Sequence, residues 1–164
     1  MGGSASKQPN IAAAGAHDHR LFASLWERVI SRGLRPLMDP LRAEIASQAR
    51  GVVLEVGAGN GLNFALYDPE RVERVEATEP NAYMLRYARS RADAAAVRVR
   101  VTQAPAEALP FPDGLFDSAL ATLVFCSVDD PGRALGEVYR TLKPDGTLLL
   151  VEHVRCEDRV AAGV

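Results

Sequence analysis

The chain has 164 residues, of which 48% are hydrophobic and 24% charged, and its net charge is -2. This size and composition predict one globular domain whose core needs neither disulfides nor a metal. The acidic balance and the 6% aromatic content argue against a nucleic-acid-binding surface, and no run approaches the ~20 apolar residues of a membrane span. Because there are only two cysteines and no spaced Cys/His set, we expect a cytoplasmic protein without a metal site.

The first part of the chain divides into a tail and a helical segment. Residues 1–18 are small and polar without periodicity, which predicts a flexible N-terminal tail. Apolar residues at helical spacing over 21–30 predict an amphipathic helix that ends at Gly33. Asp39 and Pro40 then form a cap and first-turn pair, which predicts a second helix to about residue 49.

From residue 51 onward, short apolar runs alternate with helical stretches, which is typical of a parallel sheet whose crossovers are helices. Asn81 and Asp130 are expected to cap two of those helices. The prediction is an α/β, Rossmann-like, doubly wound sheet. Five strands are expected, at about residues 52–56, 72–78, 97–101, 118–124 and 147–152.

The third of these strands alternates strictly, so that Arg98 and Arg100 share one face and the valines the other. This pattern favours a solvated edge strand that is protected by charge, rather than a nucleic-acid patch.

A glycine-rich turn follows the first strand. Gly57, Gly59 and Gly61 stand where open parallel sheets bind their ligands, and glycine allows the backbone to turn sharply and approach a ligand closely. A dinucleotide-binding turn would have its third glycine at position 62, which is a leucine. The spacing therefore disfavours NAD.

An acidic residue ends the second strand. Glu79 lies eighteen residues after Gly61 and directly before Pro80, where a carboxylate can accept hydrogen bonds from two ribose hydroxyls. This position predicts a ligand-binding role for Glu79 in either nucleoside-binding interpretation.

These motifs carry a family resemblance. The run EVGAGNG at 55–61 resembles the first motif of class I S-adenosylmethionine (SAM) dependent methyltransferases. APAEALPFPDGLFD at 104–117 and LKPDG at 142–146 resemble segments of the subgroup that methylates small molecules. TLVFCSV at 122–128 and EHV at 152–154 are similar to the methyltransferase-like branch that includes thiol methyltransferases.

The resemblance implies SAM as the cofactor and assigns roles in binding it. Glu55 and the backbone of residues 57–59 would hold the methionine part, and Glu79 would bind the ribose hydroxyls. Pro80 and the backbone of Ala106 would meet the adenine, and the backbone near Thr122 would face the methionine amino group. The expected site residues are Glu55, Gly57, Ala58, Gly59, Gly61, Glu79, Pro80, Pro105, Ala106 and Thr122.

One position departs from the family pattern. The family often has an aspartate where Pro105 stands, so its contact with the adenine amino group would be lost or taken over by Glu107.

The domain organisation expected from the resemblance has a SAM-binding core over 51–157 and a tail over 158–164. Helices in residues 19–50 would cover the cofactor site. The helix and two further strands that usually follow the fifth strand in this family are missing, so the chain is either truncated or a minimal form. The apolar strand at 148–151 would then be an exposed edge through which a homodimer could form.

The leading hypothesis is a methyltransferase acting on a small-molecule acceptor, since no Asn-Pro-Pro-Tyr motif for base methylation follows the fourth strand. A non-catalytic SAM-binding or partner-regulating module is the alternative, and an NAD-dependent oxidoreductase is the third. No catalytic base is assigned. His17, His19 and His153 are candidates without a motif, and Cys126 is expected to pack in the core.

Overall fold

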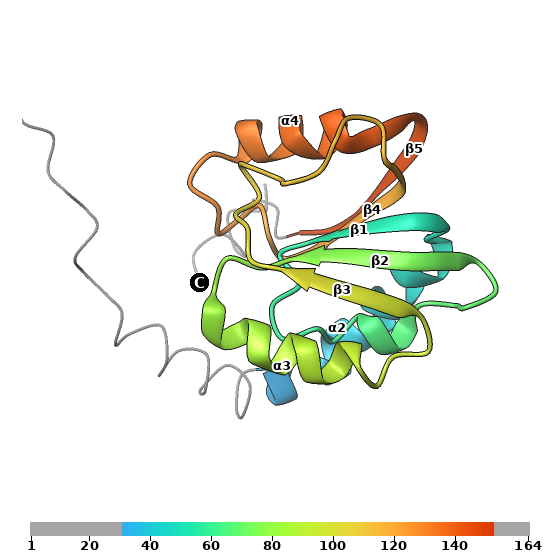
Figure 1. Cartoon of the computed structure of the whole chain (residues 1–164). Coiled ribbons are helices and arrows are strands. Elements are labelled where there is room, and N and C mark those ends of the chain that lie inside the picture. The colour runs from blue at the N-terminus through green and yellow to red at the C-terminus, as the bar shows by residue number, and fades with distance from the viewer. Residues whose placement is uncertain (1–30, 153–164) are drawn as a thin grey trace, which may run out of the picture.

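The computed structural model describes residues 31–152, which form a five-stranded parallel sheet with helices on both faces (Figure 1). The strand order is β3-β2-β1-β4-β5, which confirms the expected doubly wound α/β fold. In chain order the elements are α2 (Ser31–Gln48), β1 (Gly51–Val56), η3 (Phe64–Leu66), β2 (Val72–Thr78), α3 (Ala82–Ala92), β3 (Arg98–Thr102), β4 (Phe116–Thr122), α4 (Pro131–Thr141) and β5 (Leu142–Val151).

The central strand β1 is buried because it has a strand on each side and helices above and below. It pairs in parallel with β2 and β4, and α4 covers one face while α2 and α3 cover the other (Figure 1). Val53 packs in the core cluster that contains Ile45 and Ala88, whereas Leu54 packs in the cluster that contains Val138. Both faces of β1 are buried, as its largely apolar run predicts, with Glu55 as the polar side chain within it.

The two crossover helices begin at the expected caps. Asn81 Oδ1 accepts hydrogen bonds from the backbone N–H groups of Tyr83 and Met84, and Asp130 Oδ1 accepts from that of Arg133. These side chains satisfy N–H groups that have no partner inside the helix, so they fix where α3 and α4 start.

The helix before the sheet differs from the prediction. Instead of a break at Gly33 and a new start at Asp39, α2 runs without interruption through Pro36 and Pro40. Both prolines are exposed, so water can satisfy the carbonyls that lose their helical partners, while Met38 is buried. Tertiary packing therefore overrides the local signals. Residues 21–30, where the first helix is expected, lie outside the described residues.

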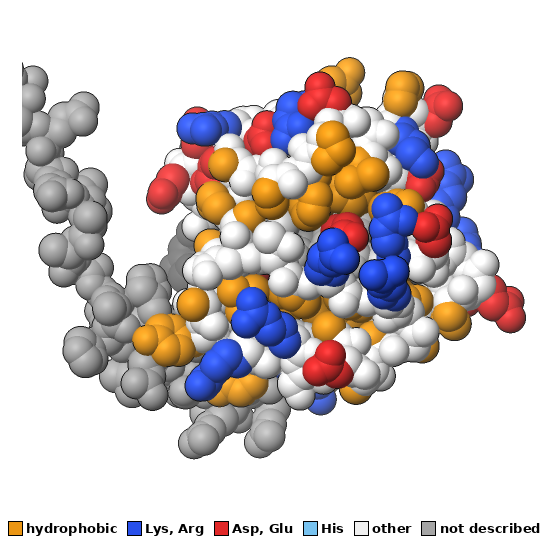
Figure 2. Space-filling model, in the orientation of Figure 1, with side chains coloured by type: hydrophobic (Ala, Val, Ile, Leu, Met, Phe, Trp, Pro, Cys, Tyr) orange, Lys and Arg blue, Asp and Glu red, His pale blue; other side chains and the backbone are white. Residues whose placement is uncertain are grey.

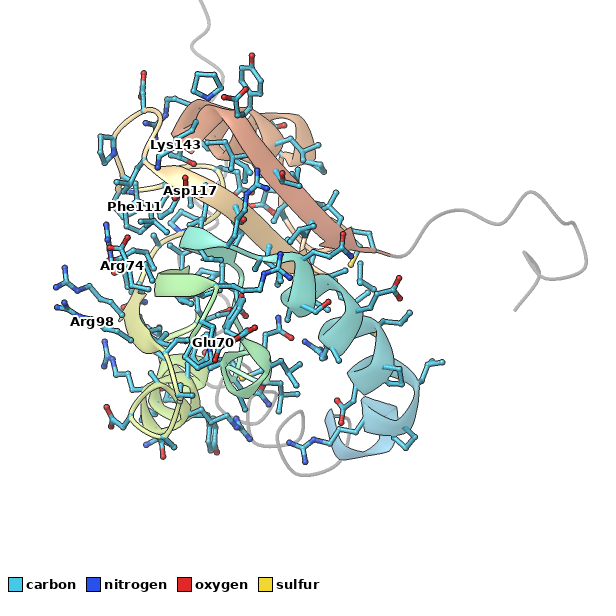
Figure 3. All side chains as sticks on the ribbon, turned by 90° about the vertical axis from the view of Figure 1, so that its right-hand side faces the viewer. Glu70, Arg74, Arg98, Phe111, Asp117 and Lys143 are labelled. Carbon is cyan, nitrogen blue, oxygen red and sulfur yellow. The ribbon has the colours of Figure 1, made fainter. Side chains whose placement is uncertain are left out.

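The fifth strand, expected from residue 147, begins at Leu142 and contains a bulge. Phe116 pairs with Leu142 and Ser118 with Thr147, so residues 143–146 are an insertion within β5, which begins earlier than expected. Lys143 Nζ donates to Asp117 Oδ1 over 2.7 Å (Figure 3). This pair fixes the bulge to β4.

The two sheet edges differ in charge. Arg98 and Arg100 are exposed on β3, and basic side chains gather over this edge in Figure 2, as the charged-edge prediction requires. On β5, Leu149 is buried and Leu150 is 42% exposed, so one apolar side chain faces outward at this edge.

Within residues 31–152 no helix combines the length and the apolarity that a bilayer crossing requires.

Candidate functional site

A cavity of about 850 Å³ opens at the carboxyl ends of β1, β2 and β4. The chain leaves β1 for β2 on one side and reaches β4 on the other, so this is the switch point where doubly wound sheets bind ligands. Its size is in the range of small-molecule sites. We call it the strand-end cavity; its lining residues are Arg42, Gly57, Ala58, Gly59, Asn60, Asn63, Glu79, Pro80, Asn81, Ala82, Tyr83, Met84, Pro105, Ala106, Glu107, Thr122, Leu123, Val124, Cys126, Ser127, Val128 and Asp129.

Two glycines of the loop after β1 are required for different reasons. Both have a positive φ, 59° at Gly57 and 57° at Gly59, which other residues rarely adopt. A Cβ on Gly57 would lie 2.8 Å from Val124 Cγ2, so this glycine allows the loop to pack on the segment after β4. Within residues 31–152, a Cβ on Gly59 would meet no atom within 4 Å apart from those of its chain neighbours. Gly59 therefore presents bare backbone to the cavity.

Glu79 is held beside Gly59 by backbone hydrogen bonds. Its Oε2 accepts from Gly59 N over 2.9 Å and its Oε1 accepts from Asn81 N over 2.8 Å. Burial raises the pKa of Glu79, and the N–H groups of Asn81 and Gly59 act in the opposite direction. Each carboxylate oxygen keeps a second lone pair, so Glu79 can accept hydrogen bonds from a vicinal diol in the cavity.

Most of the predicted site residues come together on this surface. Eight of the ten line the cavity: Gly57, Ala58, Gly59, Glu79, Pro80, Pro105, Ala106 and Thr122. Gly61 does not line it, because it packs against Phe64 and α3, where a Cβ would lie 2.6 Å from Phe64 Cε2. Glu55 does not line it either, because it lies behind Asn63.

Glu55 belongs to a buried polar network. It is 1% exposed, and its two oxygens accept from Asn63 Nδ2 over 3.0 Å and from the Tyr67 hydroxyl over 2.7 Å. Burial raises the pKa of Glu55 to about 7, although these two donors and the nearby Arg42 guanidinium favour the charged form. Glu55 thus does not face the cavity but accepts a hydrogen bond from Asn63, which does.

Sequence patterns missed several residues of the cavity. Arg42 comes from α2 and donates to Asn63 Oδ1 over 2.9 Å, a contact between positions 21 residues apart. Leu123 has a φ of 56°, a conformation that is strained for a branched side chain and that ends β4 two residues earlier than expected. Neither feature has a local sequence signal.

The carboxylate of Glu152, the residue after β5, fixes the loop that follows β4. Glu152 Oε1 accepts from Val124 N over 2.7 Å and from Phe125 N over 2.9 Å. Leu123 N donates to Val151 O over 2.8 Å. These three bonds fix the cavity residues that follow Thr122.

Comparison with known proteins places the chain in a family. Residues 54–150 match the family described as a methyltransferase domain, which is more than half of the chain. The chain belongs to this methyltransferase family. Its fold agrees, because the crystal structure of YcgJ from Bacillus subtilis superposes with a TM-score of 0.65 at 33% identity, covering 74% of this chain and 54% of that one.

Two curated relatives illustrate which methyltransferases this chain is similar to. The human thiol S-methyltransferase TMT1B is 35% identical over 128 residues, which are 71% of this chain and 52% of that protein. The demethylmenaquinone methyltransferase of Thermus thermophilus is 39% identical over 102 residues, 61% of this chain and 46% of that protein. The chain spans about half the length of these relatives. The family assignment confirms the methyltransferase resemblance and removes the support for the oxidoreductase alternative.

The residue that departs from the family pattern lies where the resemblance would place the adenine. Pro105 lines the cavity and has no N–H to donate. Glu107 also lines it, but its Oε1 accepts from Asp129 N over 3.0 Å and from Asp130 N over 3.3 Å. Glu107 thus already fixes the start of α4, which limits its freedom to replace the family's aspartate.

Cys126 is not a core residue, contrary to the prediction. It is exposed and lines the cavity, because the chain turns at Leu123 and the apolar run leaves the sheet before reaching it. Partial burial and the Glu152 carboxylate raise the pKa of Cys126, so its thiol stays protonated at neutral pH. His17, His19 and His153 lie outside the described residues.

Proposed function

We propose that this methyltransferase domain binds SAM in the strand-end cavity and moves its methyl group to a small-molecule acceptor. The observation that carries the proposal is the pairing of Glu79 with the Gly59 N–H, 2.9 Å apart, beside open space above Gly59. A diol-binding carboxylate next to side-chain-free backbone suits the ribose of an adenosyl ligand.

The residues present fit SAM in composition. Glu79 would hold the ribose hydroxyls, the backbone of residues 57–59 would follow the ligand, and Pro80 and Ala106 would flank the adenine. All of these line the cavity. SAM supplies a methyl group that its sulfonium already activates, so the protein's contribution is to align acceptor and donor, which can supply ~7 to 11 kcal/mol.

The acceptor class is proposed from the family. The names of these two relatives refer to a thiol and to demethylmenaquinone, which supports a small organic acceptor rather than a nucleic acid. A cytoplasmic location and a homodimer through β5 remain predictions from the sequence.

The proposal is tested in two steps. Calorimetric titration with SAM, S-adenosylhomocysteine and NAD should show binding of the first two and not of NAD; NAD binding alone would contradict it. A methyl-transfer assay over thiol, phenol, amine and quinol acceptors then follows. Turnover of one class supports the enzyme, whereas SAM binding without any turnover favours a non-catalytic SAM-binding module.

A further inference from the structure

Two loops from different strands line the strand-end cavity. One joins β3 to β4 (residues 103–115) and contains Ala106 and Glu107, and the other joins β4 to α4 (residues 123–130) and contains Cys126. In the sheet β2 and β1 lie between β3 and β4, so pairing between these two strands cannot hold the loops together. The relative position of the two loops therefore depends on contacts made by the loop residues.

The carboxylate of Glu107 makes such a contact. Its Oε1 accepts hydrogen bonds from Asp129 N over 3.0 Å and from Asp130 N over 3.3 Å. Asp130 caps α4, so both N–H groups lie at the start of the helix, where a negative charge is favoured. The first end of the same loop is fixed by Glu152, which accepts from Val124 N. Glu107 therefore fixes the far end of the loop after β4.

Glu107 belongs to a tight turn that also contains a cavity-lining backbone. Ala108 N donates to Pro105 O over 3.3 Å, which closes a turn with Ala106 and Glu107 at its centre. Ala106 is buried and lines the cavity. Because neighbouring residues of one closed turn move together, a ligand that packs against Ala106 also restrains Glu107.

The later part of the loop after β3 is anchored on α4. Leu109 N donates to Glu137 Oε2 over 2.9 Å. Arg140 donates to Leu109 O over 3.2 Å and to Phe111 O over 2.8 Å. Both charged residues belong to α4, and the loop passes beside this helix in Figure 1. The turn of residues 105–108 is therefore the part of the loop that contacts both the cavity and the start of α4.

We propose that Glu107 couples the two sides of the cavity, so that a cofactor packed against Ala106 fixes the loop after β4 for the methyl acceptor. This inference rests on the proposed function, in which Ala106 flanks the adenine. Residues 126–129 also line the cavity and take no part in the proposed cofactor contacts, so they are left for the acceptor. Glu107 is a positioning residue, which acts through the N–H groups of Asp129 and Asp130. The cofactor binds first, and the acceptor side becomes ordered afterwards.

Amide hydrogen exchange with and without ligand tests the coupling. In wild type, S-adenosylhomocysteine should slow exchange of the Asp129 and Asp130 amides by about fivefold or more, because exchange reports local opening. The ligand 5′-methylthioadenosine has the same adenosine and sulfur without the amino-acid end, so it should slow these amides to a similar extent.

Glu107→Ala should abolish the slowing without abolishing binding. The ratio of exchange rates without and with S-adenosylhomocysteine should fall below about twofold at both amides. The calorimetric affinity for this ligand should change by less than about threefold. A merely structural role would speed exchange equally in the free and the bound protein and leave the ratio as in wild type.

Two further variants complete the experiment. Glu107→Gln keeps an oxygen acceptor on a neutral side chain, so its exchange ratio should fall between those of wild type and Glu107→Ala. Glu70→Ala removes an exposed acid that does not line the cavity and that Figure 3 labels, and it should change neither exchange nor affinity. Thermal unfolding reports whether each variant folds, and Glu107→Gln carries the test if Glu107→Ala does not.

The outcomes separate the two proposals. If S-adenosylhomocysteine binds wild type without slowing the two amides, or if Glu107→Ala keeps the slowing, the coupling is overturned while the proposed function stands. If the wild-type chain binds neither ligand, the proposed function fails and the coupling with it.

Discussion

The backbone N–H of Gly59 donates to Glu79 Oε2 over 2.9 Å, which ties the loop after β1 to the end of β2. A second bond runs between the same two segments, from Ala58 N to Thr78 O over 2.8 Å. The glycine loop is therefore not a free turn. It is fixed against the residue proposed to bind the ribose, so that loop and carboxylate face the cavity as one unit.

Replacing Glu79 with alanine should weaken every adenosyl ligand. Hydrogen bonds to a charged group contribute roughly 1.5–3 kcal/mol, so we expect a loss of about tenfold to a hundredfold. The loss should be equal for S-adenosylhomocysteine and 5′-methylthioadenosine, because both carry the ribose; calorimetry measures it. Glu73→Ala, an exposed acid on the same strand, is the control and should change neither affinity. Unchanged binding by Glu79→Ala would remove this residue from the site.

Gly59→Ala should impair binding beyond its effect on stability. A side chain at a φ of 57° costs about 1–2 kcal/mol, and the added methyl would occupy the cavity, which we expect to lower SAM affinity by about tenfold. Gly114→Ala is a matched control, since Gly114 has a φ of 62°, also has open space at its Cβ, and lies outside the cavity. Equal effects of the two variants on affinity would argue against a close backbone approach.

Glu55 should make stability depend on pH. Its pKa is raised from 4.5 to about 7 by burial, so the native state binds a proton more tightly than the unfolded chain. The contribution of this bound proton to the free energy of unfolding is complete below the pKa of Glu55 in the unfolded chain. It is lost as the pH rises through the native pKa of about 7.

The comparison that isolates this effect is with Glu55→Gln. Between pH 5 and 8, the unfolding free energy of wild type minus that of the variant should fall by on the order of 3 kcal/mol, measured by urea denaturation. A difference that stays constant, or that rises with pH, would show that Glu55 is not held as a buried acid.

Glu152→Ala should loosen the loop after β4. Removing the carboxylate leaves the N–H groups of Val124 and Phe125 without their acceptor, at a cost of about 1–3 kcal/mol in unfolding free energy. Glu152→Gln keeps one oxygen and should lose less. Hydrogen exchange at these two amides should quicken in Glu152→Ala, and unaltered protection there would mean that other contacts fix the loop.

Much of the fold could be predicted because its signals are local. The apolar run of β1 and the caps at Asn81 and Asp130 each depend on neighbouring residues alone. Gly59 and Glu79 were also predictable, because parallel strands bring their carboxyl ends to one edge of the sheet.

The rest depends on contacts between distant segments. The continuous helix α2 follows from burial of its apolar face, which outweighs its two prolines. Arg42 reaches the cavity only through a partner 21 residues away, and the turn at Leu123 comes from bonds to the end of β5. No spacing in the sequence marks these residues.

A crystal structure of the chain with S-adenosylhomocysteine would test the central claim most directly. We predict the ligand in the strand-end cavity, with its ribose hydroxyls within hydrogen-bond distance of Glu79. A ligand bound elsewhere, or with its ribose away from Glu79, would contradict the account.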